Sequence, residues 1–314
     1  MRLIKPSFEI WDQEEGLEGI YKQIERAGRV CYKSEDKITE DSAKEFVERM
    51  IKSGHGAILE HGTIYLYSPT YDYVNANGEV EYGNPLERYE DDCYSVVRQD
   101  RDNQGVEGYY VTTNYRVLVE NNLLDDLKYI HEPTEFHEKR ITVKFICDRG
   151  ISHEFVRHRV FSFAQESTRY CNYSKDKFQG VTYIQPPWLD VDISNEDGSK
   201  FNDIYTDIYL HALTAAENAY LDLLKQWDNK VPDKRFKSGY KNNPWTPQQA
   251  RAVLPNSLKT ELVMTGFMSD WKHFFKLRDA GSAHPQAREL VHPLHMEFLR
   301  GKYLVSLYDE ANPD

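Results

Sequence analysis

The sequence has few cysteines, and their spacing excludes a disulfide scaffold or a zinc ribbon. Cys31, Cys93, Cys147 and Cys171 lie far apart, and no two of them form a Cys-x-x-Cys pair. The chain also lacks any run of the roughly 18 apolar residues that a membrane span needs, and its first residues hold no apolar signal-peptide core. We therefore expect a cytoplasmic protein that works in a reducing compartment and has no membrane partner.

Several common catalytic motifs are absent as well. The sequence has no Gly-x-Ser-x-Gly elbow, no Walker loop and no Gly-x-Gly-x-x-Gly dinucleotide loop. The segment HGAILEH, from His55 to His61, does not have the His-Glu-x-x-His spacing that places two imidazoles on one helix face for zinc. We predict no metal site there, while a metal-free binding role for the two histidines stays open.

Positive charge is scarce overall but concentrated in one stretch. The 314 residues include 39 Lys and Arg against 51 Asp and Glu, a net charge of −12. Nucleic acids and anionic membranes would repel such a chain, so we expect neither as a partner. The stretch RHRVFSFAQESTRY (157–170) nevertheless holds three arginines and several hydroxyl groups, which suit a phosphate cradle. The alternative is a surface ion-pair network with Glu154 and Glu166, and spacing alone does not distinguish the two.

Two further arginines, Arg251 and Arg278, lie closer to the C-terminus. Arg278 follows Trp271, Phe274 and Phe275 at helical spacing, so it belongs to an aromatic stripe. Its guanidinium either lies over the rings with its tip in solvent or projects into a cleft that the rings line. The spacing leaves both alternatives open.

The hydrophobic patterns predict one α+β domain over residues 1–314. Alternating apolar residues indicate strands, and apolar residues three and four apart indicate helices. Thr246-Pro247-Gln248-Gln249 predicts a capping box at a helix start, and residues 70–107 predict a long surface insertion without clean periodicity. The strands are expected at 63–67, 108–120, 141–147 and 258–266. The helices are expected at 43–54, 121–130, 153–161 (with Ser152 as its cap), 201–227, 248–254, 269–281 and 283–299.

Taken together, these pieces resemble one family, the flavin-dependent thymidylate synthases. The family signature is Arg-His-Arg, seven residues and Ser, which this chain has as Arg157-His158-Arg159 and Ser167, and the match continues through Thr168-Arg169-Tyr170. Three further blocks agree in order and spacing: HGAILEH, ARAVLPNSLKT and HFFKLR…AHPQAR. The resemblance touches residues 30–75 and 108–300 in patches. It implies a central, mostly antiparallel sheet with packed helices and a long insertion at about 70–107.

The resemblance also implies an activity, the reductive methylation of dUMP to dTMP. In the family, methylenetetrahydrofolate donates the carbon, FAD reduced by NADPH carries the hydride, and the sites form between subunits of a homotetramer. Arg278 matches the arginine that faces the uracil ring and favours its ionised form, which makes it the implied catalytic residue and removes the need for a cysteine nucleophile. The implied dUMP-binding residues are Glu154, Arg157, Gln165, Ser167, Thr168, Arg169, Arg251 and Arg278. The implied FAD-binding residues are His55, His61, Arg157, His158, Arg159, Gln165 and His273.

The chain departs from the family pattern in the blocks associated with the flavin. Phe267 and Ser269 stand where many members have Asn and Arg, while Ala57 and Ser282 replace a serine and a histidine. The departures keep three alternatives open. One is another flavin- or nucleotide-binding protein on the same scaffold with altered or absent synthase activity, and a second is a silent nucleotide-binding regulator. The third is a metallohydrolase that would use His55, His61 and His153.

Overall fold

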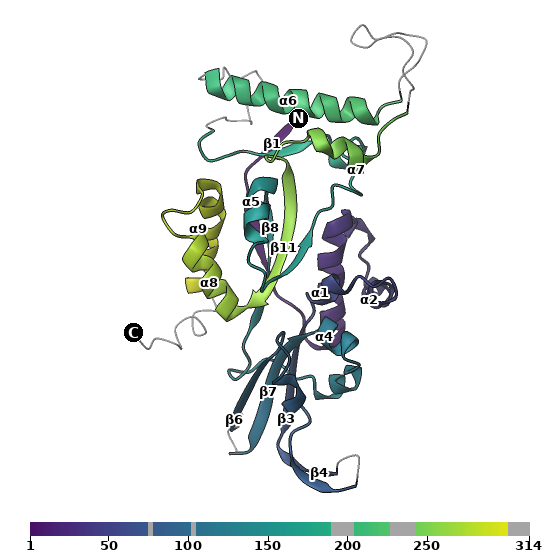
Figure 1. Ribbon diagram of the computed structural model, residues 1–314, viewed down its shortest axis with the longest axis vertical. Coiled ribbons are helices and arrows are strands. Elements are labelled where there is room, and N and C mark those ends of the chain that lie inside the picture. The colour runs from purple at the N-terminus through teal and green to yellow at the C-terminus, as the bar shows by residue number, and fades with distance from the viewer. Residues whose placement is uncertain (75–77, 102–104, 190–203, 227–242, 301–314) are drawn as a thin grey trace.

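The structure is a computed structural model, which describes residues 1–74, 78–101, 105–189, 204–226 and 243–300. Its centre is a four-stranded antiparallel sheet with the strand order β2-β8-β11-β9 (Figure 1). These strands are β2 (Ser7–Trp11), β8 (Arg140–Asp148), β11 (Lys259–Phe267) and β9 (Ser162–Gln165). The predicted α+β class is confirmed, and so are the strands expected at 141–147 and 258–266.

Helices cover both faces of the central sheet (Figure 1). The alternation of side chains along β11 explains this, because Leu262 and Met264 join one core cluster and Val263 joins another on the opposite face. The first face carries α5 (Arg149–Phe155), α8 (Met268–Arg278) and α9 (Pro285–Arg300), and the second carries α1 (Gly16–Tyr32). The helices predicted at 269–281 and 283–299 are therefore confirmed as α8 and α9.

Helix α1 was not among the predicted elements, although Ile20, Ile24, Ala27 and Val30 recur at helical spacing and are buried. The helix ends at Lys33, whose backbone is left-handed with a φ of 48°. It is followed by the 3₁₀ turn Glu35–Lys37, by α2 (Ser42–Lys52), which matches the helix predicted at 43–54, and by the short α3 (Gly56–Leu59).

A second, smaller sheet extends the molecule beyond the central one (Figure 1). It has the antiparallel order β3-β7-β6, formed by β3 (Thr63–Pro69), β7 (Glu107–Asn114) and β6 (Val96–Arg101). The hairpin β4 (Tyr71–Val74) and β5 (Val80–Gly83) and the 3₁₀ turn Glu87–Tyr89 also lie here. The prediction of a loop over 70–107 is therefore wrong for most of that segment. Strand β6 lies at the edge of its sheet and is mostly solvent-exposed, so its sequence lacks the alternation that would have marked it.

The predicted strand at 108–120 is half wrong. Strand β7 ends at Asn114, and the chain continues as helix α4 (Tyr115–Glu120). The Asn114 side chain accepts a hydrogen bond from the backbone N–H of Val117 at 3.3 Å, which caps the helix and stops the strand. The helix predicted at 121–130 is a 3₁₀ helix, Leu124–Tyr129.

The end of the molecule that holds the N-terminus is built by a long helix over a two-stranded ladder (Figure 1). Strand β1 (Arg2–Ile4) pairs in parallel with β10 (Thr182–Ile184), and α6 (Ile204–Leu224) confirms the described part of the helix predicted at 201–227. The capping box is confirmed, because the Thr246 backbone N–H donates to the Gln249 side chain at 2.9 Å. Its helix is shorter than predicted: α7 (Pro247–Ala250) passes into the 3₁₀ turn Arg251–Val253. A further 3₁₀ turn is Asp176–Phe178.

Helix α5 differs from the predicted helix at both ends. It runs from Arg149 to Phe155, and its N-cap is Asp148, whose Oδ1 accepts from the Ile151 N–H at 2.8 Å, rather than Ser152. The residues expected in its second half, 156–161, form turns instead, and the edge strand β9 begins directly after them at Ser162. The Arg-His-Arg segment therefore lies beyond the helix, where its side chains are not tied to one helical face.

Replacing Asp148 with alanine should lower the free energy of unfolding by about 1–2 kcal/mol, because it removes the cap of α5. It also removes the bond that Gln286 Nε2 donates to Asp148 Oδ2 at 2.6 Å, which ties α9 to α5. The control is Asp148→Asn, which keeps an acceptor for Ile151. Urea unfolding measures both variants, and equal losses in the two would contradict the assignment of Asp148 as a cap.

Within the described residues, no helix combines the length and the apolar character that crossing a membrane would require. The same residues contain no group of three His, Cys, Asp or Glu side chains arranged to hold a metal ion.

Candidate active site

Arg278, the last residue of α8, reaches across to the end of α5. Its Nη1 donates to Glu154 Oε2 at 2.7 Å, its Nη2 to the Glu154 carbonyl at 2.9 Å, and its Nε to His158 Nε2 at 3.0 Å. The Arg278 side chain is 18% exposed and Glu154 is 31% exposed. The guanidinium is thus held in one orientation at a partly open position, rather than lying loosely over the aromatic rings.

His158 is neutral in this arrangement. Burial, the charge of Arg278 and the nearby His273 lower the pKa of His158 to about 4. The ring therefore accepts a hydrogen bond from Arg278 instead of repelling it. His273 lies on the exposed side, with its ring centroid 6.2 Å from that of His158.

Arg157 and Arg159 are exposed, and neither has an ion-pair partner among the described residues. The carboxylates that the ion-pair network would have used are engaged elsewhere: Glu154 pairs with Arg278, and Glu166 pairs with Lys259. The ion-pair alternative for the Arg-His-Arg segment is therefore wrong. Both guanidinium groups remain available to an anionic ligand.

The segment Ser167–Tyr170 follows β9, and we call it the nucleotide loop because the resemblance implies that it binds dUMP. The Ser167 N–H donates to the Cys31 carbonyl at 2.9 Å, and the Arg169 N–H donates to Ser167 Oγ at 3.3 Å. Arg251 approaches the loop from the end of α7, and its Nη1 donates to Thr168 Oγ1 at 2.9 Å. Arg169 and Arg251 are exposed while Thr168 is buried, so the hydroxyl anchors the loop and the two cations face outward.

Gln165 connects the edge strand to α5 and to β11. It is the last residue of the edge strand β9 and pairs with Leu262, which places its side chain on the sheet face that carries α5. Its Nε2 donates to Ser152 Oγ at 2.8 Å and to Thr260 Oγ1 at 3.2 Å. The structure thus forms two arginine groups, one of Arg278 with Glu154 and His158, and one of Arg251 with Thr168.

The two histidines of HGAILEH lie in different surroundings. His55 is exposed at the start of α3, whereas His61 is fully buried and its Nδ1 lies 2.8 Å from Thr265 Oγ1. Burial and the charge of Arg140 lower the pKa of His61 to about 3, so this ring is neutral. A buried ring does not reach a ligand at the surface, so the predicted flavin contact of His61 rests on the resemblance alone.

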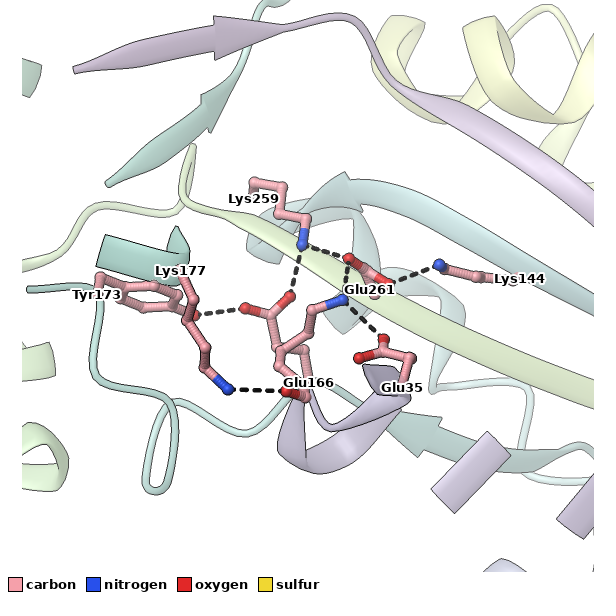
Figure 2. Close-up of polar contacts among 8 residues, drawn as sticks. Glu35, Lys144, Glu166, Tyr173, Lys177, Lys259 and Glu261 are labelled. Carbon is pink, nitrogen blue, oxygen red and sulfur yellow. Dashed lines mark hydrogen bonds and ion pairs between the residues drawn. The ribbon is translucent and has the colours of Figure 1, made fainter. Parts of the chain in front are cut away.

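A buried lysine–glutamate network behind the nucleotide loop was missed by the sequence patterns (Figure 2). Glu261 on β11 forms ion pairs with Lys33, Lys144 and Lys259. Burial alone would raise the pKa of Glu261, but the three ammonium groups outweigh it and hold that pKa well below its ordinary value. Lys259 and Glu261 are two residues apart on one strand and so share a face, which is the sequence signal that could have found part of this network.

Phe267 and Ser269, which depart from the pattern of the resembling family, contact other residues of this chain at the start of α8. Ser269 donates its hydroxyl to Glu138 Oε1 at 2.6 Å, and the Phe267 ring lies 5.4 Å from the Arg140 guanidinium. A phosphate-bearing cofactor therefore fits this chain through the unpaired guanidinium groups of Arg157 and Arg159, and not through positions 267 and 269.

Two cavities lie in the described part of the chain, and Arg278 lines neither of them. One, of about 560 Å³, lies between the two sheets and is lined by Trp11, Tyr65, His131 and Arg140, among others. The second, of about 500 Å³, includes Tyr32, Arg49, His55 and Lys177. Tyr32 also contacts Tyr170 of the nucleotide loop, with ring centroids 5.3 Å apart, so the second cavity adjoins that loop.

A comparison with models of known protein families decides the relationship. The model described as thymidylate synthase complementing protein matches residues 81–300, which is more than half of the chain. The chain belongs to this family. The matched segment contains both arginine groups and the whole nucleotide loop, so the predicted resemblance is confirmed at the level of the family.

Individual members of the thymidylate synthase complementing protein family match over a shorter segment. Flavin-dependent thymidylate synthases from Mycobacterium bovis and Mycobacterium tuberculosis are 33% identical over 143 residues, which cover 46% of this chain and 50% of theirs. The enzyme of Mycolicibacterium vanbaalenii is 31% identical over the same length. The chain thus spans about half the length of the curated relatives it matches. Among solved structures, the UMP/dUMP methylase PolB from Streptomyces cacaoi gives a TM-score of 0.40 at 16% identity, covering 96% of this chain and 93% of that one.

Proposed function

We propose that this protein catalyses the reductive methylation of dUMP to dTMP, with methylenetetrahydrofolate as carbon donor and FAD reduced by NADPH as hydride carrier. The observation that carries the proposal is Arg278, a partly exposed guanidinium held in one orientation by Glu154 and by a neutral His158. Membership of the family supports the same chemistry.

Arg278 would act on the uracil ring electrostatically. An arginine is always protonated, so it is not a general base, but a fixed positive charge stabilises negative charge as it develops across N3, C4 and C5. This makes C5 nucleophilic without a covalent adduct.

The cysteines support a mechanism without a thiol nucleophile. Cys171 is buried four residues after Ser167, and burial together with Glu166 raises the pKa of Cys171 to about 12. Burial also raises the pKa of Cys31 to about 11. Both groups are therefore protonated thiols at neutral pH, which are poor nucleophiles.

Three exposed arginines would hold the phosphate of dUMP. Arg157, Arg169 and Arg251 offer guanidinium groups that bind phosphate oxygens in pairs, and Ser167 and Thr168 add hydroxyls. Glu154 and Gln165 would lie beside the base, because they sit next to Arg278 and at the end of β9. Fixing the phosphate positions C5 for the transfer.

FAD would be bound by Arg157, His158, Arg159, Gln165 and His273, with His55 and His61 of another subunit near it, and NADPH would be its reductant. When bound, the reduced flavin supplies the hydride that converts the transferred methylene into a methyl group. We further propose a cytoplasmic homotetramer in which residues of neighbouring subunits complete each site. The exposure of Arg157, Arg159 and Arg169 in the single chain supports this arrangement.

The direct test measures dTMP formation from dUMP, methylenetetrahydrofolate and NADPH, with and without added FAD. Synthesis that depends on flavin supports the proposal. Bound flavin without dTMP would favour the alternative of another flavin- or nucleotide-binding protein, for which the altered surroundings of Phe267 and Ser269 speak. Size-exclusion chromatography with light scattering tests the tetramer.

Replacing Arg169 with alanine should weaken dUMP binding by about tenfold to a hundredfold and leave FAD binding unchanged, since one charge-assisted hydrogen bond contributes about 1.5–3 kcal/mol. Arg159→Ala is the matched control, because it also removes one exposed guanidinium but is assigned to the flavin. Arg159→Ala should weaken FAD binding and leave dUMP binding unchanged. Titration calorimetry with dUMP and flavin fluorescence give the two affinities, and equal losses of both ligands in both variants would show that the site is divided wrongly.

A further inference from the structure

The residue before the nucleotide loop is a buried carboxylate. Glu166 is 2% exposed and is flanked in sequence by Gln165 and Ser167. Its side chain accepts hydrogen bonds from the Tyr173 hydroxyl and from Lys259 Nζ, both at 2.8 Å. Its backbone N–H donates to the Glu261 carbonyl at 2.9 Å. Both the main chain and the side chain of Glu166 are therefore fixed to the sheet.

Lys259 is the cation that neutralises this carboxylate. Its Nζ bridges Glu166 and Glu261, and its side chain is 14% exposed (Figure 2). The other two lysines of the network, Lys33 and Lys144, pair with Glu261 but have no bond to Glu166 among the described residues. Lys259 is thus the one described cation that both carboxylates share.

The placement of a negative charge here is unexpected for an anion-binding loop. A phosphate bound by Ser167 and Arg169 would lie within about 10 Å of Glu166, since Ser167 directly follows Glu166 and Arg169 is three positions after Glu166 in the chain. Two unit charges at that separation change an affinity by roughly tenfold or more at an effective dielectric constant of about 20. The carboxylate would oppose binding unless a cation cancels its field.

We propose that Lys259 is a positioning residue for the substrate phosphate, because it anchors the start of the nucleotide loop through Glu166 and cancels the charge of Glu166 behind the bound phosphate. The inference rests on the proposed binding of the dUMP phosphate by this loop. It adds a role for a residue that does not itself touch the ligand. It also predicts opposite effects on phosphate affinity when the positive charge of Lys259 or the negative charge of Glu166 is removed.

The sign of the effect provides the test. Lys259→Met leaves Glu166 uncompensated and should weaken the binding of both dUMP and inorganic phosphate by roughly tenfold or more. Glu166→Gln removes the negative charge and should tighten the binding of both by a similar factor. The double variant Lys259→Met/Glu166→Gln should return to within about threefold of the wild-type affinity. Deoxyuridine, which has no phosphate, should bind all variants equally.

Titration calorimetry on the full-length protein measures these affinities without requiring turnover. Lys144→Met is the matched control, because Lys144 also pairs with Glu261 in the same network but not with Glu166, and it should leave phosphate binding unchanged. If Lys259→Met fails to fold, Glu166→Gln and the double variant still test the predicted sign.

A merely structural role for the pair gives a different result. Loosening of the loop would weaken binding in both single variants, and would weaken deoxyuridine as much as dUMP; either result overturns the inference. If the wild-type protein binds dUMP and forms dTMP but the two single variants do not change phosphate affinity in opposite directions, the inference is refuted and the proposed function is not. A wild-type protein that binds no dUMP would refute both the inference and the proposed function.

Discussion

Replacing Arg278 with alanine should lower kcat for dTMP formation by about 10²–10³-fold, which corresponds to about 2.7–4 kcal/mol for the loss of one charge-stabilising donor. The effect should fall mainly on kcat, because the developing charge on the uracil ring exists only in the transition state. The affinity for dUMP should change much less, since Arg169 and Arg251, which we propose bind its phosphate, remain. Steady-state kinetics with dUMP as the varied substrate gives both values.

The control for this variant is Lys276→Ala on the same helix. Lys276 is also in the last turn of α8 and is exposed, so its removal changes the helix charge equally without touching Glu154 or His158. Its kcat should stay within about twofold of the wild type, as expected of a surface substitution. Turnover of Arg278→Ala that equals that of Lys276→Ala would remove Arg278 from the mechanism.

Replacing Glu261 with glutamine should lower the free energy of unfolding by about 3–5 kcal/mol. The side chain is 6% exposed and is the common partner of three ammonium groups, and removing one member of a buried ion pair leaves charge without compensation. Guanidinium unfolding at pH 7 measures the loss. The comparison variant is Glu35→Gln, whose carboxylate pairs with Lys33 but is 35% exposed. It should cost no more than about 1 kcal/mol, and equal losses in the two variants would contradict a central role for Glu261.

The pH dependence of stability follows from the same carboxylate. The pKa of Glu261 is lower in the folded protein than in the unfolded chain, so the unfolded state binds its proton first as the pH falls. Its contribution is therefore complete above the unfolded pKa of about 4.3 and is lost as the pH falls further towards the folded value. Wild-type protein should lose stability below about pH 4.5 more steeply than the Glu261→Gln variant, as thermal unfolding over that range would show.

The sequence predicted the central architecture because its strands have strong periodic signals. Residues 141–147 alternate clearly, and 258–266 have the consecutive apolar residues Leu262, Val263 and Met264 near their centre, as expected of a strand with both faces covered. The sequence signal was weaker where a single neighbouring strand or a helix cap determines where an element ends. Strand β9 is only four residues long and lies at a sheet edge. The helical pattern in the sequence continues through Phe161, whereas the helix capped by Asp148 ends at Phe155, so the pattern did not show where the helix ends.

The candidate site was predicted less completely than the fold. Residue types and spacing singled out Arg278 and the Arg-His-Arg segment, and the resemblance implied their roles, but neither indicated the partners that hold them. One alternative placed Glu154 in an ion-pair network with the neighbouring arginines, whereas it binds a guanidinium 124 residues further along the chain. The network around Glu261 joins residues from the end of α1, from β8 and from β11, and no local pattern encodes contacts between elements so far apart in sequence.

Strand β11 ends at Phe267 and helix α8 begins at the next residue, so no loop separates the sheet from the helix that carries Arg278. The number of residues in α8 therefore fixes the position of the Arg278 guanidinium relative to the sheet. Deleting a single residue from α8 would swing Arg278 by about 100° around the helix axis and retract it by about 1.5 Å. The length of this helix therefore sets where the positive charge of Arg278 lies relative to the sheet.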